Sequence, residues 1–563
     1  MTAQTMRRWA GAAIALVPAY VVATTLLAIV LAFQPAPYQD QWSLVAAYRE
    51  FLRDGASFDW FWRQHNEHRI VFPRLVFLAD LAWARGSNLL NLAAILAIQV
   101  SGVLLFARLA LSGRRSILTA AALAIAVTAL FSLTQWENLV WGFQVQFVGV
   151  YACGGWGLFL FCRAVGEDDR IDWASWAGAM ALLTVCTFSM ANGVLAGGAM
   201  LALAIAARFP VRLLLATLGG AAVLAAAYFH GYHMVEGHSS PTLALTHPAA
   251  FAHYVLAYLG ALFGMPHQAF ALGYGMVGAA LTALMAAEIV RRRERDVAQL
   301  ALFGVVLFIG LSAAATALGR LGFGYQQAIS SRYVTPSAYF WAALLVYWSR
   351  RTTMGERRGL KVAAAGALAV AAAVLVRIQT PMSLVVADWS EHVARGADGL
   401  LLGVEDAEAS ARLFPDRPRL MDWDGFLRAQ RLSFYGGPEA GWIGRRVDRV
   451  FASAPPQACL GAFDELKPAP GGPAAGWRAK GWAWDRRSHL PARRIVLASG
   501  EGDIVGLGAR GAPRPDVRRA VPEVWLMKSG WTGVARAAPP GPVRAYAVLW
   551  DGRACPIGER PAP

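Results

Sequence analysis

Two polar clusters carry most of the residue types that could do chemistry. The first lies between Asp40, in the motif QDQW, and Arg69, in the motif HNEHR; the second is the segment GRLGFGYQQAISSRY at 319–333. Both clusters lie beside long apolar runs. Ionisable side chains are costly to remove from water, so a chain that gathers them next to apolar segments is expected to use them.

Asp40 is the first candidate catalytic residue. It lies about seven residues beyond an apolar run at 9–33. A carboxylate there, partly shielded from water by neighbouring helices, can accept a proton from a hydroxyl nucleophile, because burial raises its pKa toward the working pH. The alternative is a structural one, in which Asp40 caps a helix that begins near Gln41. Position alone does not choose between the two.

The HNEHR motif places four chemically versatile side chains within five residues. They are followed at once by the apolar segment IVFPRLVFL, which predicts a polar wall at the mouth of a cavity. A metal site built from two histidines and Asp40 is one alternative, but histidines three residues apart do not match a known zinc motif. Surface hydrogen bonding is the simpler alternative. The four side chains of this predicted wall are His65, Glu67, His68 and Arg69.

The second cluster is the predicted phosphate site. Its two arginines, Arg320 and Arg332, carry guanidinium groups that match phosphate oxygens bidentately, and its glycines let the backbone approach a ligand. Arginines that merely reach lipid headgroups are the alternative. The polar neighbours favour binding. Further side chains from this loop and from the turns QWEN and MANG could line the same cavity: Glu137, Asn192, Gln326 and Tyr333.

Composition identifies a membrane protein. The chain has 563 residues, of which 56% are hydrophobic and 16% charged, and its mean hydropathy is +0.41. In soluble proteins about a quarter of the residues are charged. The net charge of +16 does not indicate a nucleic-acid partner, because the arginines cluster in short loops between apolar runs, where they orient helices in a membrane.

Hydropathy predicts about eleven membrane-spanning helices. They fall at 9–33, 88–110, 116–133, 145–163, 173–189, 191–208, 211–229, 268–290, 297–317, 333–349 and 361–378. The segment 248–264 is apolar too, but a crossing there would invert every later loop, so we expect an interfacial or re-entrant helix packed on protein.

Basic residues sort the loops into two sets. The inner set holds Arg7, Arg8, Arg114, Arg115, Arg163, Arg170, Arg208, Arg212, the run from Arg291, Arg350, Arg351, Arg357, Arg358 and Lys361. The outer set holds loop 34–87, the QWEN and MAN turns, loop 230–267, the loop at 319–333 and everything after about residue 377. In loop 34–87, one apolar face at 44–52 predicts a helix on the outer membrane surface.

The sequence pattern changes twice after the last predicted span. A transmembrane domain at 1–380 is followed by a helical linker at 381–455. Short alternating segments with glycine-rich turns then predict an antiparallel β-sandwich at 456–563. Cys459 and Cys555 bracket this domain, and a disulfide between them would tie its first and last strands. We expect the tryptophans Trp477, Trp482 and Trp484 to pack in its core rather than stack on sugars.

Residues 1–380 resemble the membrane glycosyltransferases of the GT-C superfamily. The similarity lies in the many helices, the long first outer loop with Asp40 soon after the first helix, and the outer loops with arginines. The resemblance implies transfer of a sugar from a polyprenyl-phosphate donor to a glycan or lipid acceptor. Asp40 matches the family's first-loop acidic position, as general base, and Arg320 or Arg332 matches the arginines that hold the donor phosphate.

The resemblance also sets the expected location and cofactor. It implies a multi-pass protein of a bacterial inner membrane, with the N-terminus cytoplasmic and the C-terminal domain periplasmic. Many members have two acidic residues in the first loop; here Gln41 follows Asp40, and Glu67 would supply the second carboxylate. A divalent cation, Mg²⁺ or Mn²⁺, is the one cofactor considered. A transporter or flippase of lipid-linked glycans, and a glycan polymerase or ligase, are the alternative functions.

Overall fold

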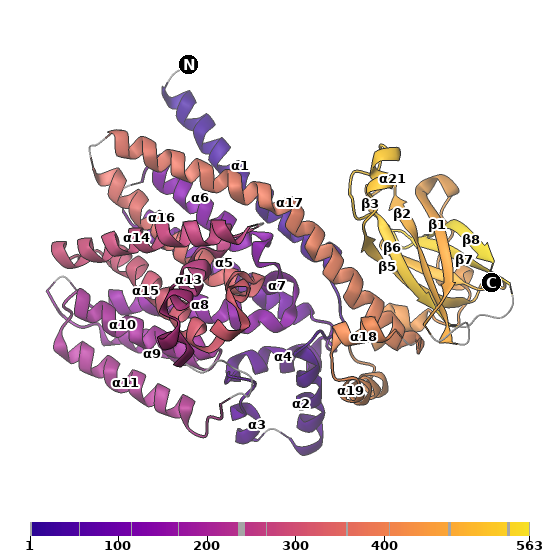
Figure 1. Cartoon of the computed structure of the whole chain (residues 1–563), viewed down its shortest axis with the longest axis horizontal. Coiled ribbons are helices and arrows are strands. Elements are labelled where there is room, and N and C mark those ends of the chain that lie inside the picture. The colour runs from indigo at the N-terminus through magenta and orange to yellow at the C-terminus, as the bar shows by residue number, and fades with distance from the viewer. Residues whose placement is uncertain are drawn as a thin grey trace. The chain divides into compact units, whose positions relative to one another are not determined.

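A computed structural model describes residues 3–55, 57–113, 115–166, 168–234, 242–265, 267–355, 358–404, 406–470, 475–536 and 541–561 (Figure 1). The chain forms two compact units. The helical unit comprises Met1–Leu27, Ser57–Val76 and Asn91–Met382. The mixed unit comprises Ala28–Ala56, Phe77–Leu90 and Ser383–Pro563.

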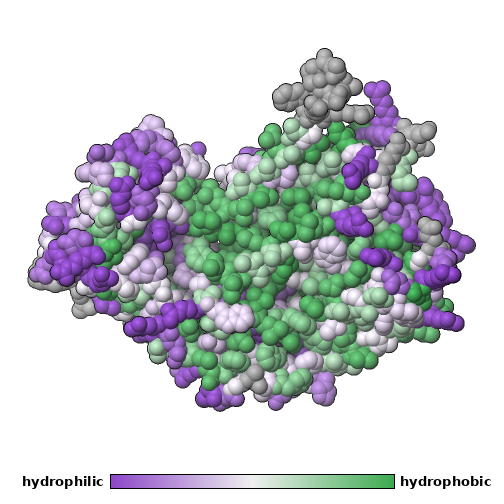
Figure 2. Space-filling view, turned by 180° about the vertical axis from the view of Figure 1, so that it is seen from behind, coloured by the Kyte–Doolittle hydropathy of each residue, from purple (hydrophilic) through white to green (hydrophobic). Residues whose placement is uncertain are grey.

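Apolar α-helices make up most of the helical unit. They are α1 (Ala3–Ala32, which continues into the mixed unit), α3 (Phe58–Trp62), α4 (Val71–Trp83, likewise shared), α5 (Leu89–Leu111), α6 (Ile117–Phe131), α7 (Trp136–Val140), α8 (Val145–Arg163), α9 (Trp173–Thr187), α10 (Val194–Ala206), α11 (Val211–Phe229), α12 (Thr242–Thr246), α13 (Pro248–Leu259), α14 (Gln268–Arg292), α15 (Val297–Arg320), α16 (Val334–Met354) and the first half of α17 (Arg358–Leu402). Short 3₁₀ turns connect several of them. Figure 2 shows apolar side chains spread over the surface of these helices.

Eight segments of the described chain are long and apolar enough to cross a membrane, by length and composition. They are Gly11–Ala32, Leu89–Leu111, Ile117–Val140, Gly142–Arg163, Val211–Phe229, Gln268–Arg292, Val297–Phe323 and Arg358–Leu402. The prediction of about eleven spans is therefore not confirmed. The runs predicted at 173–189 and 191–208 form the shorter helices Trp173–Thr187 and Ala191–Ala206. The helix predicted at 333–349, α16, has 21 residues but is not among the eight.

Ion pairs gather several arginine-bearing loops at one end of the helical unit. Arg350 pairs with Asp296 at 3.0 Å and donates to the carbonyl of Leu109 at 2.9 Å, and Arg295 pairs with Asp169 at 3.2 Å. These contacts join the last turns of α5 and α16 to the chain after α8 and after α14, at the four loops that the basic residues place in one set. Two members of that set, Arg114 and Arg357, lie outside the described residues.

The segment expected to be interfacial or re-entrant forms a short, buried helix. α13 has 12 residues, about 18 Å of helix, which is well short of the roughly 30 Å core of a bilayer. It packs on α14 and α15, and Tyr254 and Tyr258 are fully buried. A Cβ at Gly275 of α14 would lie 1.9 Å from the carbonyl oxygen of Leu256, so only glycine permits this close approach of the two helices. The expected packing on protein is thus present.

One curled antiparallel sheet forms the C-terminal part of the mixed unit. Its strands are β1 (Cys459–Pro468), β2 (Trp477–Asp485), β3 (Leu490–Pro491), β4 (Arg494–Ala498), β5 (Ile504–Ala512), β6 (Gly530–Ala535), β7 (Pro542–Val548) and β8 (Ala554–Pro561). The order is β1-β2-β6-β5-β4-β7-β8, with β3 paired to β2, and β1 packs against β8. The predicted β-sandwich is thus a nearly closed sheet. Alternating apolar residues fill its interior.

A disulfide joins Cys459 of β1 to Cys555 of β8, as the sequence predicts. Their Cα atoms are 6.3 Å apart and 96 residues separate them in the chain. The tryptophan prediction is confirmed for Trp477, which is buried in the interior of the sheet. Trp484 is buried as well, but on the other face of β2, in a separate cluster with Val517 and Val524 against which the half-buried Trp482 packs.

Short helices complete the mixed unit. They are α2 (Gln41–Asp54), α18 (Ala407–Leu413), α19 (Arg417–Gln430), α20 (Val447–Val450) and α21 (Pro515–Ala520), together with the second half of α17. The apolar face of α2 does not lie free on a surface. Trp42, Val45 and Tyr48 are buried in the core of this unit, where α2 packs against α19.

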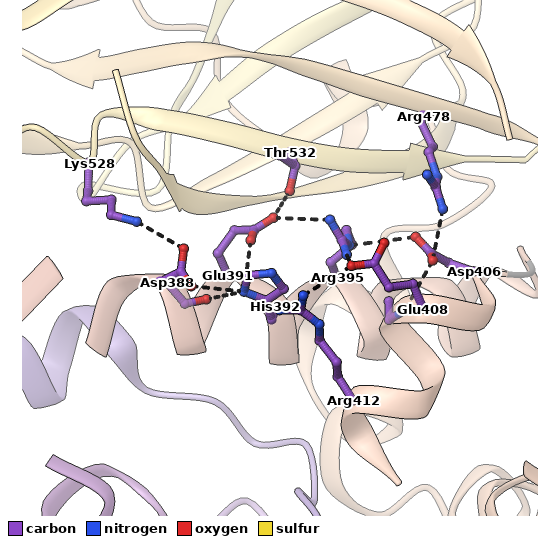
Figure 3. A network of polar contacts seen from close by, with 11 residues as sticks. Asp388, Glu391, His392, Arg395, Asp406, Glu408, Arg412, Arg478, Lys528 and Thr532 are labelled. Atoms are coloured by element: carbon purple, nitrogen blue, oxygen red, sulfur yellow. Dashed lines mark hydrogen bonds and ion pairs between the residues drawn. The ribbon is translucent and has the colours of Figure 1, made fainter. Parts of the chain in front are cut away.

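Charged side chains hold the sheet to α17 and α18 (Figure 3). The hydroxyl of Thr532 donates to the buried carboxylate of Glu391, and Lys528 pairs with Asp388 at 3.2 Å. On α18's side, Arg478 of β2 pairs with the buried Asp406 at 2.9 Å. A carboxylate that is buried without a partner is costly, so the loss of one of these basic partners would destabilise the packing of the sheet on the helix.

Replacing both disulfide cysteines by serine (Cys459→Ser with Cys555→Ser) should destabilise the sheet. A bridge across 96 residues restricts the unfolded chain, which is worth about 4 to 5 kcal/mol. We expect a markedly lower urea midpoint for the full chain, followed by tryptophan fluorescence, and the same shift when the wild type is reduced. Cys153→Ser, at an unpaired cysteine, is the control. Equal midpoints for all proteins would contradict this prediction.

Candidate functional site

A tight turn presents the HNEHR motif at the end of the helical unit opposite Arg350. His65 and His68 exchange backbone hydrogen bonds of 2.8 and 2.9 Å across the turn. Asn66 takes a φ of +47°, a left-handed conformation that asparagine tolerates better than most residues. The turn places Glu67 at its tip, beside His68.

One buried arginine, Arg69, anchors this turn. The guanidinium of Arg69 donates to the backbone carbonyls of Trp62, Tyr228 and His230, so it ties the turn to α3 and to the end of α11. The hydroxyl of Tyr228 donates to the carbonyl of Glu67 at 2.8 Å. These three carbonyl contacts make Arg69 a positioning residue for Glu67, and the predicted contact of Arg69 with a substrate stays a prediction.

Glu67 and Arg320 form the central ion pair of the site. Arg320 is the last residue of α15, and its Nη2 donates to a carboxylate oxygen of Glu67. The same oxygen lies 3.6 Å from Nε2 of His68. His68 is oriented by its other ring nitrogen, Nδ1, which accepts a hydrogen bond of 3.2 Å from the backbone N–H of Ala191. Three predicted site residues therefore meet directly.

The electrostatics of the pair keep Glu67 ionised. Burial by itself would raise the pKa of Glu67, but the charges of His68 and Arg320, together with hydrogen bonds, outweigh burial and lower the pKa to about 2. A carboxylate with so low a pKa accepts protons poorly at neutral pH. Glu67 is therefore suited to hold and orient Arg320 rather than to act as a general base.

A second arginine–carboxylate pair lies at the same end of the helical unit. Arg332 Nη2 is 3.5 Å from a carboxylate oxygen of Glu137. Two hydrogen bonds also join the segments that carry this pair. The backbone N–H of Glu137 donates to the Ser331 hydroxyl at 2.9 Å, and the side-chain amide of Asn138 donates to the Arg332 carbonyl at 2.9 Å. Nε of Arg332 is buried and has no hydrogen-bond partner among the residues that the structure describes.

Two predicted lining residues lie deeper than expected. Tyr333 is buried, with its ring 5.4 Å from that of Tyr258. The amide of Asn192 donates to the hydroxyl of Tyr151 at 3.2 Å, and that hydroxyl lies 3.1 Å from the Tyr258 hydroxyl. The backbone of the MANG turn still reaches the site through its contact with His68.

The remaining predicted residues of this unit lie at its margin. Gln326 is exposed and donates to Gln268 at 3.3 Å. The ring of His65 packs on Phe143, with 5.3 Å between centroids.

Asp40 belongs to the mixed unit. It occupies the N-cap position of α2, but its side chain makes no capping hydrogen bond, so the structural alternative for this carboxylate is not realised. The chain on either side is anchored: Gln39 N–H donates to the Leu413 carbonyl at 2.7 Å, and the Gln41 amide donates to Asn88 at 2.6 Å. The predicted role of Asp40 beside Glu67 and Arg320 stays a prediction.

Sequence reasoning missed Tyr228 and Tyr254. Tyr254 is fully buried, its hydroxyl has no hydrogen-bond partner among the described residues, and it lies within electrostatic range of Arg320 and Tyr333. Each is a phenol within an apolar segment, Tyr228 near the end of 211–229 and Tyr254 in the middle of 248–264, and this is the one signal that could have singled them out.

Metal ligation was a sequence alternative for His65, His68 and Asp40. In the described part of the chain, no group of three or more histidine, cysteine, aspartate or glutamate side chains is arranged to hold a metal ion. For His68 the reason is visible, since Nδ1 accepts from a backbone N–H and Nε2 faces Glu67. The divalent cation thus rests on the family resemblance alone.

Compared with known proteins, the sequence matches no protein-family model and no curated protein.

Glu67→Gln should make the protein less stable in a pH-dependent way. The folded pKa of about 2 lies below the ordinary value of about 4.3, so the ion pair contributes fully above the ordinary value and is lost as pH falls toward 2. We expect the variant to melt a few degrees below the wild type at neutral pH. The gap should close as pH falls below about 4.

Thermal unfolding of the purified full chain between neutral and acid pH measures this gap. Glu559→Gln, which breaks an exposed pair with Arg544, should have little effect at any pH. A gap of constant size down to acid pH would show that Glu67 contributes through packing and not through its charge.

Proposed function

We propose that this protein transfers a sugar from a polyprenyl-phosphate donor to a hydroxyl of a glycan or lipid acceptor, at the extracytoplasmic face of a bacterial inner membrane. One observation carries the proposal. Arg320 and Arg332 lie at one end of the helical unit, each is paired with a carboxylate, and Nε of Arg332 is buried without a hydrogen-bond partner among the described residues.

Paired arginines suit the phosphate of a lipid donor. A guanidinium carries five N–H donors in a fixed fork, so Arg320 can keep its contact with Glu67 and still donate to phosphate oxygens. The unsatisfied Nε–H of Arg332 is costly to bury and would be relieved by an anionic ligand. Position also fits, because both arginines stand at the ends of apolar helices that a polyprenyl chain could lie against.

The proposed reaction is a displacement at the anomeric carbon. Asp40 takes the proton of the acceptor hydroxyl, the acceptor oxygen forms the new glycosidic bond, and the bond to the lipid phosphate breaks. The two arginines stabilise the negative charge that develops on the leaving phosphate. Glu67 holds Arg320 in place and, with its low pKa, leaves the role of base to Asp40.

Substitution of the arginines should weaken lipid-phosphate binding. We expect the full chain in nanodiscs to bind decaprenyl phosphate in preference to decaprenol, and Arg332→Met to weaken that binding by about tenfold. Arg320→Met should do the same when combined with Glu67→Gln, a pairing that leaves no unpaired carboxylate. Native mass spectrometry measures the bound lipid.

The control is Arg212→Met, at an exposed arginine at the start of α11, away from the site. Equal retention of decaprenyl phosphate and decaprenol by the wild type, or unaltered binding by the Arg320 and Arg332 variants, would contradict the phosphate site.

Asp40→Asn should reduce transfer by about a hundredfold or more, because an amide cannot accept the proton of the acceptor. The assay offers a panel of radiolabelled polyprenyl-phosphate hexoses and pentoses to inner membranes that contain the protein, and it measures label in covalent product. Asp54→Asn, at the exposed far end of α2, should keep wild-type activity and thermal stability.

Full activity of a folded Asp40→Asn variant would remove Asp40 from the mechanism. The same assay separates transfer from the alternative functions. A flippase moves labelled donor across the bilayer without forming a new glycosidic bond, whereas a polymerase or ligase yields transfer of a preassembled glycan rather than a single sugar.

A further inference from the structure

Trp525 stands out on the surface of the β-sheet region. Among the described residues from 459 to 561 it is the one large apolar side chain that is exposed, with 51% of its surface accessible. It lies in the loop at 513–529 between β5 and β6, which also contains α21. A large exposed aromatic residue forgoes the stabilisation of burial, so its exposure calls for an explanation.

The indole of Trp525 is held in one orientation. Its Nε1 donates to the His489 carbonyl at 2.9 Å, and the ring stands edge-on against the buried Trp484, with 6.4 Å between centroids. The loop itself is anchored by the burial of Val517 and Val524 against Trp484. The flat face of the indole is therefore presented as a rigid platform.

A charged pair beside the platform joins the same two segments. Arg486 donates to both carboxylate oxygens of Glu523, at 2.8 and 2.5 Å, and His489 lies within electrostatic range of Glu523. Arg486 and His489 lie in the turn after β2, and Glu523 lies two residues before Trp525. Hydrogen-bonding groups of both kinds, donor and acceptor, are thus placed near the indole.

The turn that carries Arg486 is itself rigid. The buried carboxylate of Asp485 accepts hydrogen bonds from the N–H groups of Arg487 at 2.9 Å and Trp550 at 3.0 Å. His489 closes the turn with a φ of +55°, a strained conformation for a residue other than glycine. Strain of this kind is kept where the surrounding structure demands it, often at binding sites.

We propose that Trp525, Arg486 and Glu523 form a binding site for a sugar ring of a glycan. A pyranose ring has an apolar face of C–H groups, which can stack on the indole, and an equatorial rim of hydroxyls, which can donate to Glu523 and accept from Arg486. Rigid presentation lowers the entropy lost on binding. This inference does not depend on the transfer reaction, since glycan binding can be tested without turnover.

A membrane surface is the competing occupant, and the surroundings of Trp525 argue against it. Membrane-surface segments bury a row of apolar side chains. Here Val517 and Val524 are buried on Trp484, Val521 and Leu526 are partly buried against the same cluster, and the carboxylate of Glu523 lies two residues before the indole. A single exposed aromatic ring with a polar rim fits a sugar better than a lipid headgroup layer.

The experiment uses the full chain in nanodiscs on a printed array of oligosaccharides that includes bacterial surface glycans. The wild type should bind a subset of them, and Trp525→Ala should bind that subset at least about tenfold more weakly. Trp525→Phe, which keeps an aromatic face, should retain part of the affinity. Glu523→Gln should weaken binding without removing the platform.

Trp173→Ala is the matched control, because Trp173 is exposed to a similar degree, 49%, and lies in α9 of the helical unit. It should bind as the wild type does. The inference is overturned if the wild type binds no glycan on the array, or if Trp525→Ala and Trp525→Phe both bind as the wild type does. It is equally overturned if the loss of Trp525 abolishes flotation of the nanodiscs with glycan-free phosphatidylglycerol vesicles.

Discussion

The pairing of Arg320 with Glu67 is the interaction on which the candidate site depends. An arginine at the end of an apolar helix pays a large desolvation cost unless an anion meets it. Glu67 supplies that anion from 253 residues away in the chain, and the turn around it is shaped to do so. The ring of His68 lies beside the Glu67 carboxylate, and the hydroxyl of Tyr228 donates to the Glu67 carbonyl. Arg69 anchors the turn that carries Glu67. These polar contacts all support one ion pair.

The same constraint recurs elsewhere in the protein. At the opposite end of the helical unit, Arg350 meets Asp296, and Arg351 meets Glu288 at 2.6 Å. In the mixed unit, the buried Asp398 of α17 meets Arg494 of β4. Apolar packing stabilises the helices and the interior of the sheet. Buried charges at the ends of these elements and between them are paired, because an unpaired buried charge is costly.

The two proposed ligand contacts use different chemistry. The arginines of the helical unit offer charge and forked donors, which suit a phosphate. Trp525 offers an apolar face with hydrogen-bonding groups beside it, which suits a sugar ring. Donor phosphate and glycan are the two kinds of group that a polyprenyl-phosphate-dependent glycosyltransferase must handle, so the two proposals are chemically consistent although each is tested alone.

Local patterns in the sequence were sufficient for much of the fold. The apolar runs predicted the helices, the alternation after residue 459 predicted the strands, and two cysteines at the borders of that region predicted the disulfide. These inferences succeed because helix and strand periodicity is written in neighbouring residues. The predicted count of about eleven spans is not confirmed, since hydropathy does not show that the apolar runs at 173–189 and 191–208 fold as helices of only 15 and 13 residues.

The sequence does not show which side chains contact each other across the site. Glu67, His68 and Arg320 could be named as candidates from their types, but the contact between Glu67 and Arg320 spans 253 residues and exists only once the helices pack. The three carbonyl contacts of Arg69 and the burial of Tyr333 have the same origin. Residue type determines what chemistry a side chain can do; its neighbours in space, which depend on packing of distant segments, determine its protonation state and which of its donors remain for a ligand.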